Sequence, residues 1–203
     1  MCNFIDYRGS IKINGQEVRN IKPKDLAKKI TILSQQSSMY FDYKVIDVIK
    51  FGRYSYNDSN FFVRKESGYI LDILKNIGID HLKDKYMSEL SGGECQKVFI
   101  ARVFAQNPDI VLLDEMNNNL DIKSQIYIIE NIKKFFKDKI LITVFHDLNL
   151  VRNLNNKVMI LKDSKKYKYG SIDDVLNREN LKNVYDVDVV EFMVNSLSKW
   201  ESK

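Results

Sequence analysis

Residues 110–115 read Ile-Val-Leu-Leu-Asp-Glu, an apolar run that ends in two acidic residues. Four apolar residues in succession are too few for a helix and are typical of a strand that is buried in a parallel sheet. A second run, Ile-Leu-Ile-Thr-Val, occupies residues 140–144, and residues 122–136 between the two runs have the apolar spacing of a helix. These segments predict a βαβ unit with buried parallel strands, and hence an α/β fold.

Asp114 and Glu115 stand at the end of the first predicted strand. Ligands of open α/β sheets bind beyond the carboxyl ends of the strands, where an aspartate can hold Mg²⁺ and an adjacent glutamate can orient or deprotonate a water molecule. His146 follows the second strand and should reach the same edge, where an imidazole can donate a hydrogen bond to a γ-phosphate. Taken one by one, these residues have simpler alternatives: Asp114 and Glu115 as a pair of solvated acids, and His146 as a structural histidine.

A phosphate-binding element is predicted upstream, where residues 90–94 read Leu-Ser-Gly-Gly-Glu at the start of a predicted helix. Two glycines leave the backbone N–H groups unobstructed at the positive end of the helix, and the Ser91 hydroxyl adds a donor. A glycine turn with a serine cap is the alternative. The acids that follow the next apolar strand favour the phosphate site.

The remaining segments complete an α/β chain without internal repeats. Residues 9–18 predict a hairpin around Asn14-Gly15, a type I′ turn signal. Apolar residues between 44 and 86 recur mostly at helical spacing. The other predicted elements are a short helix at 24–29, a strand at 30–33, a hairpin at 157–170, and helices at 172–176 and 179–184.

In this order and spacing, the segments resemble the ATP-binding subunits of ATP-binding cassette (ABC) transporters, from Gly9 to about Val190. Residues 90–94 resemble the signature motif, 110–115 the Walker B strand with its catalytic glutamate, 117–121 the D-loop, 145–147 the switch-histidine segment, and Gln35 the Q-loop glutamine. The resemblance implies a P-loop ATPase core, with an inserted helical subdomain and a partial N-terminal antiparallel β-subdomain.

The same resemblance implies a single domain over residues 1–203. Its expected parts are a partial β-subdomain and core strand (1–34), the Q-loop and helical subdomain (35–90), the core with signature, Walker B, D-loop and switch histidine (91–170), and a C-terminal helical region (171–203).

The resemblance implies ATP and Mg²⁺ as cofactors, which two such subunits would hold between them. We expect these two subunits to form a homodimer. Ser91, Gly92, Gly93, Glu94 and Asp121 would bind the nucleotide, Asp114 and Gln35 would attend Mg²⁺, and Glu115 and His146 would be catalytic. Hydrolysis would move transmembrane permease subunits, so the chain is expected in the cytoplasm, peripheral on the inner face of the cell membrane.

A finer likeness concerns the cargo. Residues 45–54, 146–150 and 177–185 resemble importers of iron-siderophores, haem and vitamin B12, which implies an indirect link to a substrate-binding protein. Two alternatives stay open: an inactive or regulatory remnant of such a subunit, and a non-transport ABC ATPase that acts on nucleic acid. The second usually carries coiled-coil insertions or a tandem cassette, and this sequence shows neither.

The sequence departs from the family at its beginning. Members carry Gly-x-x-x-x-Gly-Lys-Ser/Thr ahead of these motifs to hold the β- and γ-phosphates, and none of the eight glycines here is followed by lysine. Residues 1–7 resemble the end of the helix that follows that Walker A loop. We therefore expect an N-terminally truncated chain that by itself binds ATP weakly and hydrolyses it at most marginally.

Composition limits the other classes of function. The net charge of +5 arises mostly from lysines spread along the chain, which favours a solvated surface over nucleic-acid binding. The sequence lacks an apolar run long enough to span a membrane. Cys2 and Cys95 have neither a pairing framework nor metal-ligand spacing, so they are expected to be ordinary thiols in a reducing compartment.

Overall fold

The computed structural model describes residues 7–34, 42–56, 63–115, 120–153 and 157–201. They form two compact units, residues 1–146 and 147–203, which are described separately below. Among the helices in these described ranges, none is long and apolar enough to cross a membrane.

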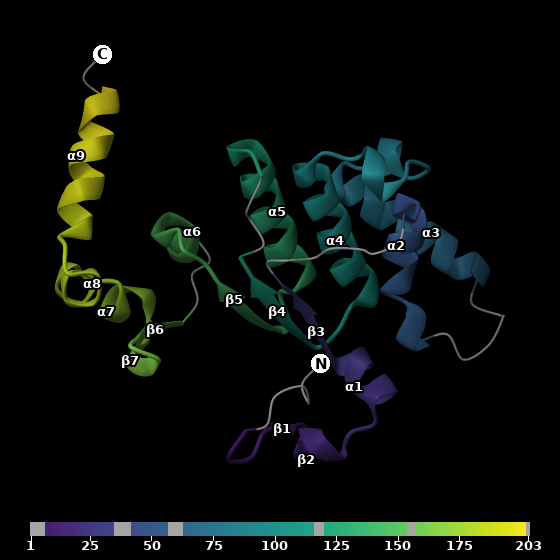
Figure 1. Cartoon of the computed structure of the whole chain (residues 1–203), viewed down its shortest axis with the longest axis horizontal. Coiled ribbons are helices and arrows are strands. Elements are labelled where there is room, and N and C mark those ends of the chain that lie inside the picture. Colours follow the sequence, from purple (N-terminus) through teal and green to yellow (C-terminus); the bar gives the residue numbers. More distant parts are fainter. Residues whose placement is uncertain (1–6, 35–41, 57–62, 116–119, 154–156, 202–203) are drawn as a thin grey trace. The chain divides into compact units, whose positions relative to one another are not determined.

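A parallel three-stranded sheet carries the first unit. Its strands are β3 (Ile30–Leu33), β4 (Ile110–Asp114) and β5 (Ile140–Val144), in the order β3-β4-β5 (Figure 1). Residue Ile110 lies opposite Ile30 on one side and Ile140 on the other, so the carboxyl ends of the three strands lie at one edge. Helix α5 (Ile122–Phe135) connects β4 to β5. The predicted βαβ unit and the α/β fold class are confirmed.

One face of this sheet is covered by helix α4 (Gly92–Gln106) together with α5 (Figure 1). Val111 and Leu113 of β4 point into this layer and are buried. The two helices meet through aromatic side chains, since the Phe104 ring stacks on Phe135 with centroids 4.3 Å apart. Burial of these apolar surfaces is the main contribution to the stability of the unit.

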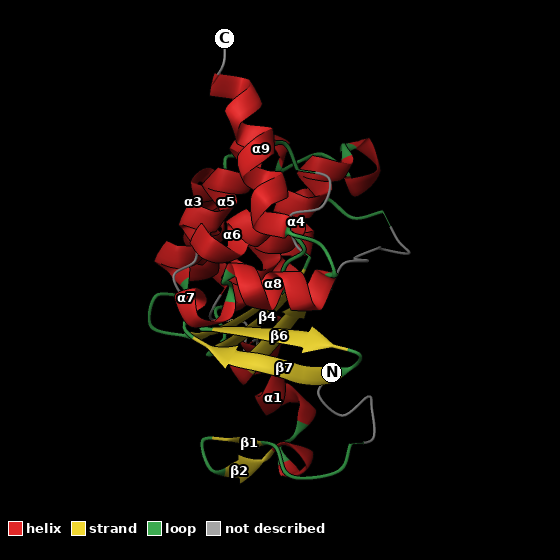
Figure 2. Cartoon of the chain, turned by 90° about the vertical axis from the view of Figure 1, so that its left-hand side faces the viewer, coloured by secondary structure: helices red, strands yellow, loops and turns green. Residues whose placement is uncertain are grey.

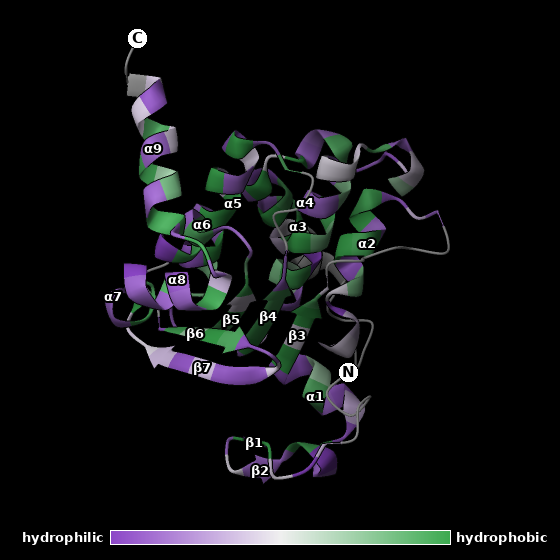
Figure 3. Cartoon of the chain, turned by 60° about the vertical axis from the view of Figure 1, so that its left-hand side comes forward, coloured by the Kyte–Doolittle hydropathy of each residue, from purple (hydrophilic) through white to green (hydrophobic). Residues whose placement is uncertain are grey.

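The other face of β5 differs from the sequence prediction of buried parallel strands. Ile140, Ile142 and Val144 are 58%, 55% and 50% exposed, although all three strands are apolar (Figure 3). An apolar run identifies a strand, but whether both of its faces are covered depends on what packs against the sheet. The prediction of a buried strand is therefore wrong for one face of β5.

Residues between 44 and 86 are helical where they are described, as predicted. They form α2 (Val45–Phe51), the 3-10 turn η2 (Tyr54–Tyr56), α3 (Val63–Ile77) and η3 (Asp80–Leu82), and η4 (Met87–Glu89) follows. Both α2 and α3 pack on α4. The fully buried side chains of Ile49, Ile73 and Leu74 belong to this helical layer.

A small antiparallel hairpin opens the described chain. It consists of β1 (Lys12–Ile13) and β2 (Gln16–Glu17), joined by Asn14 and Gly15 at φ angles of 51° and 80°. Positive φ at both central residues is what a type I′ turn requires, so the predicted hairpin is confirmed. It is followed by η1 (Val18–Asn20) and α1 (Pro23–Lys29), whose Leu26 joins Ile13 in a small apolar cluster.

The second unit contains the predicted late hairpin, β6 (Val158–Lys162) and β7 (Lys165–Gly170), shown as antiparallel strands in Figure 2. Its helices are α6 (Leu148–Asn153), α7 (Ile172–Val175), α8 (Arg178–Tyr185) and α9 (Val189–Glu201). Val175, Leu176 and Leu181 form its core. The sequence analysis did not identify α6, and it covered α9 only as part of the expected C-terminal helical region.

Candidate functional site

Ser91 is the N-cap of helix α4, the arrangement that the sequence analysis gave as the alternative to a phosphate site. Its hydroxyl accepts a hydrogen bond from the Glu94 backbone N–H at 3.4 Å, and the Glu94 carboxylate accepts from the Ser91 backbone N–H at 2.8 Å. This reciprocal capping box fixes the chain direction at the start of the helix. Gly92 and Gly93 form the first helical positions, where backbone N–H groups have no partner within the helix, an arrangement that can bind an anion.

The Glu94 carboxylate also accepts a hydrogen bond from the Ser91 hydroxyl. Hydrogen bonds from the Ser91 hydroxyl and the Ser91 backbone lower the pKa of the Glu94 carboxyl, and the nearby Lys85 and His81 act in the same direction. Stabilisation of the charged form explains the shift. The carboxylate therefore stays ionised and keeps the Ser91 side chain oriented.

Asp114 and Glu115 occupy the carboxyl end of β4. Asp114 lies opposite Val144 of β5, and the Glu115 backbone N–H donates to the Val144 carbonyl at 3.1 Å. Glu115 has a φ of 48°, in the left-handed region that non-glycine residues seldom adopt. Such strain persists where the surroundings over-determine it and is often found at functional sites. The chain therefore leaves the direction of β4 at Glu115, which is the catalytic candidate.

His146 meets Glu115 at this edge. Its Nε2 atom contacts Oε1 of Glu115, and the two side chains differ sharply in exposure, at 80% for His146 and 14% for Glu115. The structure thus brings together the two residues that the sequence predicted to be catalytic. A nearly enclosed carboxylate beside an accessible imidazole can orient a water molecule and exchange protons with solvent through the histidine.

Asp121 is found at the N-cap of α5. Its Oδ1 accepts from the Ser124 backbone N–H at 2.8 Å and its Oδ2 accepts from the Ser124 hydroxyl at 2.7 Å. These hydrogen bonds lower the pKa of the Asp121 carboxyl. The structure accordingly gives Asp121 a capping contact, and its predicted part in nucleotide binding stays a prediction. Gln35 and residues 116–119 lie outside the described residues.

Asp114 is the described candidate for a magnesium ligand. It is half-buried at the strand end and offers the carboxylate oxygen that Mg²⁺ prefers, and Mg²⁺ usually takes only one or two carboxylates beside water and phosphate. Within the described ranges, no group of three or more His, Cys, Asp or Glu side chains is arranged to hold a metal. The residues fit an ion that is held jointly with a nucleotide.

Comparison with known proteins agrees with this geometry. The family described as "ABC transporter" matches residues 1–118. The petrobactin import ATP-binding protein YclP of Bacillus subtilis (strain 168) is 32% identical over 183 residues, which cover 89% of this chain and 72% of that protein. The uncharacterized ABC transporter ATP-binding protein MJ0089 of Methanocaldococcus jannaschii is 36% identical over 188 residues, with coverage of 89% and 71%.

Two solved structures are also similar. An inward-facing metal-chelate type ABC transporter matches with a TM-score of 0.69 and 26% identity, over 79% of this chain and 64% of that one. The ATP-binding subunit of an ABC transporter matches with a TM-score of 0.74, over 93% and 76% of the two chains. At 18% identity the second match supports the fold alone. The chain belongs to the ABC transporter family, in its class of ATP-binding proteins.

Some residues that matter to the architecture of the site were missed by sequence reasoning. Asp42 and Ser88 contact each other just ahead of the signature motif. Gly52, noted only as part of a stretch resembling importers, allows α2 to approach α4 so closely that a Cβ atom would lie 2.4 Å from the Arg102 carbonyl. A pair distant in sequence leaves no local signal, whereas the glycine after an amphipathic helix could have suggested close packing.

Proposed function

We propose that this chain is the ATP-binding subunit of an ABC importer and that it energises import by ATP hydrolysis at a dimer interface. The cargo class that we propose is an iron-siderophore, haem or cobalamin-type chelate. Relatives named as petrobactin importers and a structure titled as a metal-chelate type transporter support this choice. The pairing of Glu115 with His146 at the carboxyl edge of the sheet is the observation that carries the enzymatic part.

The signature end of α4 is proposed to contact the ATP held by the second subunit. Ser91, Gly92 and Gly93 present the positive end of the helix, where the dipole and the N–H groups of the first turn favour a phosphate. Glu94 holds Ser91 in place through the capping box. This end of the helix can therefore stabilise charge on the γ-phosphate, with Asp121 close to the same nucleotide in the proposed dimer.

At the carboxyl edge of the sheet, Glu115 is proposed to position and deprotonate the attacking water, with His146 contacting the γ-phosphate. Asp114 and Gln35 would hold Mg²⁺, which supplies positive charge to the phosphates when bound. The burial of Glu115 protects the carboxylate from bulk water, and the exposed His146 can turn from Glu115 toward a phosphate. The contact of Glu115 with His146 supports the proposed roles of these two residues.

Transmembrane permease subunits are the proposed partners, beside a second ATP-binding subunit, with a substrate-binding protein linked indirectly through the permease. The chain would accordingly lie in the cytoplasm on the inner face of the membrane. An aromatic surface on α2 and η2 suits the permease: Phe51 and Tyr54 are exposed, and the Phe51 ring makes an edge contact with Tyr43 at 5.0 Å. Exposed aromatic side chains are frequent anchors in protein interfaces.

The proposed function is tested by uptake in cells that express the chain. The allele is replaced by Glu115→Gln, and uptake of a radiolabelled ferric siderophore is measured against Glu130→Gln, which changes an exposed acid on α5. We expect uptake to fall more than tenfold for Glu115→Gln and to stay unchanged for Glu130→Gln. Equal uptake in both strains, at equal amounts of protein, would contradict the proposal.

A photo-crosslinking amino acid tests the partner. Placed at Tyr54 in living cells, it is expected to capture an integral membrane protein, whereas the same group at Tyr185 of the second unit, also exposed, is the control. Capture from both positions alike, or none from Tyr54, would count against the permease surface.

A further inference from the structure

Two segments far apart in the sequence are joined directly ahead of the signature motif. The Asp42 carboxylate accepts hydrogen bonds from the Ser88 backbone N–H at 3.1 Å and from the Ser88 hydroxyl at 2.8 Å. Asp42 is the first described residue after positions 35–41, and Ser88 precedes Ser91 by one turn of chain. One carboxylate thus connects the segment that follows Gln35 with the segment that leads into α4.

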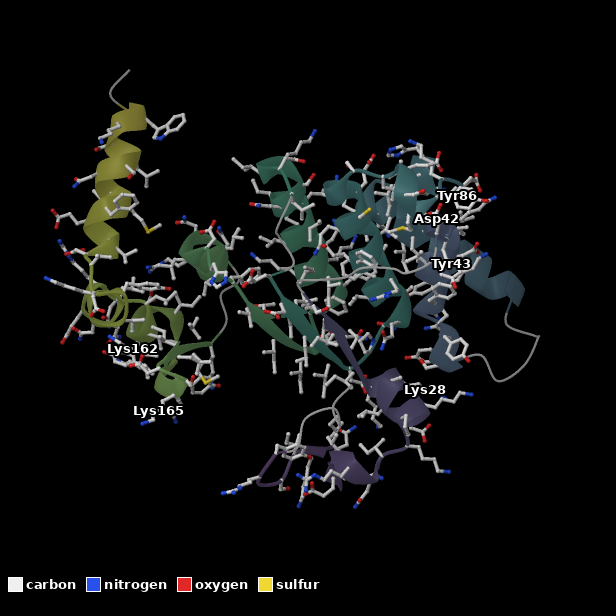
Figure 4. All side chains as sticks on the ribbon, viewed as in Figure 1. Lys28, Asp42, Tyr43, Tyr86, Lys162 and Lys165 are labelled. Atoms are coloured by element: carbon white, nitrogen blue, oxygen red, sulfur yellow. The ribbon has the colours of Figure 1, made fainter. Side chains whose placement is uncertain are left out.

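The backbone around this contact is paired as well. The Met87 N–H donates to the Tyr43 carbonyl at 2.9 Å, and the Val45 N–H donates to the Lys85 carbonyl at 2.9 Å. Lys44 and Tyr86 form an isolated antiparallel bridge between these bonds. Figure 4 labels Asp42, Tyr43 and Tyr86, which lie side by side at this junction.

The junction continues into the helix that carries the signature serine. Ser88 lies in η4, whose Met87 carbonyl accepts from the Leu90 N–H at 3.3 Å and from the Cys95 thiol at 3.7 Å. Cys95 is in the first turn of α4 and its own N–H donates to the Ser91 carbonyl at 2.9 Å. A chain of hydrogen bonds therefore leads from Asp42 through η4 to the capping box of Ser91.

A second attachment holds the opposite end of α4. The Arg53 guanidinium donates to the Ala105 carbonyl at 3.2 Å, and Gly52 packs against the Arg102 backbone. The hydrogen bonds of Asp42 add a side-chain contact near the opposite, amino end of α4, where η4 leads into Ser91.

We propose that Asp42 is a positioning residue that holds Ser91 and the two following glycines in the direction that suits a phosphate. This inference rests on the proposed function for its consequence, but the contact itself is independent of nucleotide. A carboxylate that accepts two hydrogen bonds, one of them from a backbone N–H, makes a stronger contact than a neutral group that accepts only one of them.

Hydrogen exchange on the full chain without nucleotide tests the positioning role. In Asp42→Ala we expect the amides of residues 88–95 to exchange about three- to tenfold faster, with residues 98–106 of the same helix unchanged. Asp42→Asn keeps one acceptor oxygen and should recover part of the protection. Asp47→Ala is the matched control, because Asp47 is a neighbouring acid on α2 that accepts a hydrogen bond from the Lys50 Nζ atom at 3.2 Å.

A double-mutant cycle separates the pair from general loosening. Ser88→Ala removes the hydroxyl donor but keeps the backbone N–H, so its effect should be smaller than that of Asp42→Ala. The double variant should exchange no faster than Asp42→Ala alone. Unchanged exchange at residues 88–95, an equal rise at residues 98–106, or strictly additive effects would overturn the proposal.

Uptake of a ferric siderophore measures the functional consequence of losing the Asp42–Ser88 contact. Asp42→Ala should lower uptake about three- to tenfold at an unchanged amount of protein, Asp42→Asn should be intermediate, and Asp47→Ala should match the unmutated chain. Full uptake in Asp42→Ala would overturn the positioning role. If uptake proves insensitive to Glu115→Gln as well, the proposed importer function fails, and the exchange measurements still decide whether Asp42 positions Ser91.

Discussion

The side chains of Glu115 and His146 contact each other at the carboxyl ends of two neighbouring parallel strands, although helix α5 lies between them in the sequence. The pair joins an enclosed carboxylate to an accessible imidazole. At the end of an isolated strand, Asp114 and Glu115 would both be exposed to water, where a carboxylate is a poor base. Enclosure and pairing give Glu115 a defined orientation, which is the requirement that general-base catalysis places on geometry.

Glu115→Gln is expected to keep ATP binding and to slow hydrolysis roughly 10²- to 10⁴-fold, because an amide cannot accept the proton of the attacking water. The measurement is steady-state phosphate release and nucleotide affinity in an assembly that binds MgATP. Asp138→Asn, at an exposed acid after α5, serves as the control. Hydrolysis at the unmutated rate would show that Glu115 is not the base.

Ser91→Ala is expected to destabilise the first unit by about 1 kcal/mol at pH 7, because the capping box loses its side-chain partner. The pKa of Glu94 lies below its ordinary value of 4.5 in the folded chain, so this stabilisation is fully present above that value and is lost as the pH falls through the lowered one. Urea unfolding at pH 7 and at about pH 3 should show the difference between variant and unmutated chain shrinking in acid. A difference that grows in acid would contradict the assignment.

Glu94→Gln isolates the titrating part of the same contact. The amide oxygen can still accept from the Ser91 backbone, but it carries no charge, so the dependence of stability on acid pH that belongs to this site should disappear. Comparing the slopes of unfolding free energy against pH for the two chains checks this result.

Gly52→Ala is expected to cost about 1–3 kcal/mol, since the new Cβ would lie 2.4 Å from the Arg102 carbonyl oxygen and 3.0 Å from the Gln106 backbone nitrogen. Gly68→Ala in α3 is the matched control: no heavy atom lies within 4 Å of its Cβ position, and alanine favours helix by about 0.5–1 kcal/mol. Urea denaturation should give opposite signs for the two variants. Equal stability of both would mean that α2 and α4 do not pack closely.

Ile142→Thr tests the open face of β5. Ile142 is 55% exposed, so we expect less binding of a hydrophobic dye and a change in stability within about 0.5 kcal/mol. Leu113→Thr on β4 is the contrast, because this buried side chain would leave a hydroxyl without a partner and a cavity in the core, at a cost of about 2–4 kcal/mol. Equal destabilisation by both would show that this face of β5 is covered in solution.

Local sequence patterns were sufficient to predict several helices, strands and turns and the residues at which they begin or end. The apolar runs at 110–113 and 140–144 became β4 and β5, Asn14-Gly15 became the turn with two positive φ angles, and Ser91 with Glu94 formed the cap of α4. Each of these outcomes depends on residues within a few positions of one another. The propensities and hydrogen bonds that decide them are therefore present in the sequence itself.

Contacts between distant segments were decided only by the tertiary structure. They are the direct contact of Glu115 with His146, of which the sequence predicted only the shared sheet edge, the hydrogen bonds from Ser88 to Asp42, the close approach at Gly52, and the exposure of one face of β5. Such contacts depend on how helices and strands pack, and the same local patterns are compatible with many packings. The sequence by itself determined which residues stand at strand and helix ends, whereas packing determined which of those ends meet.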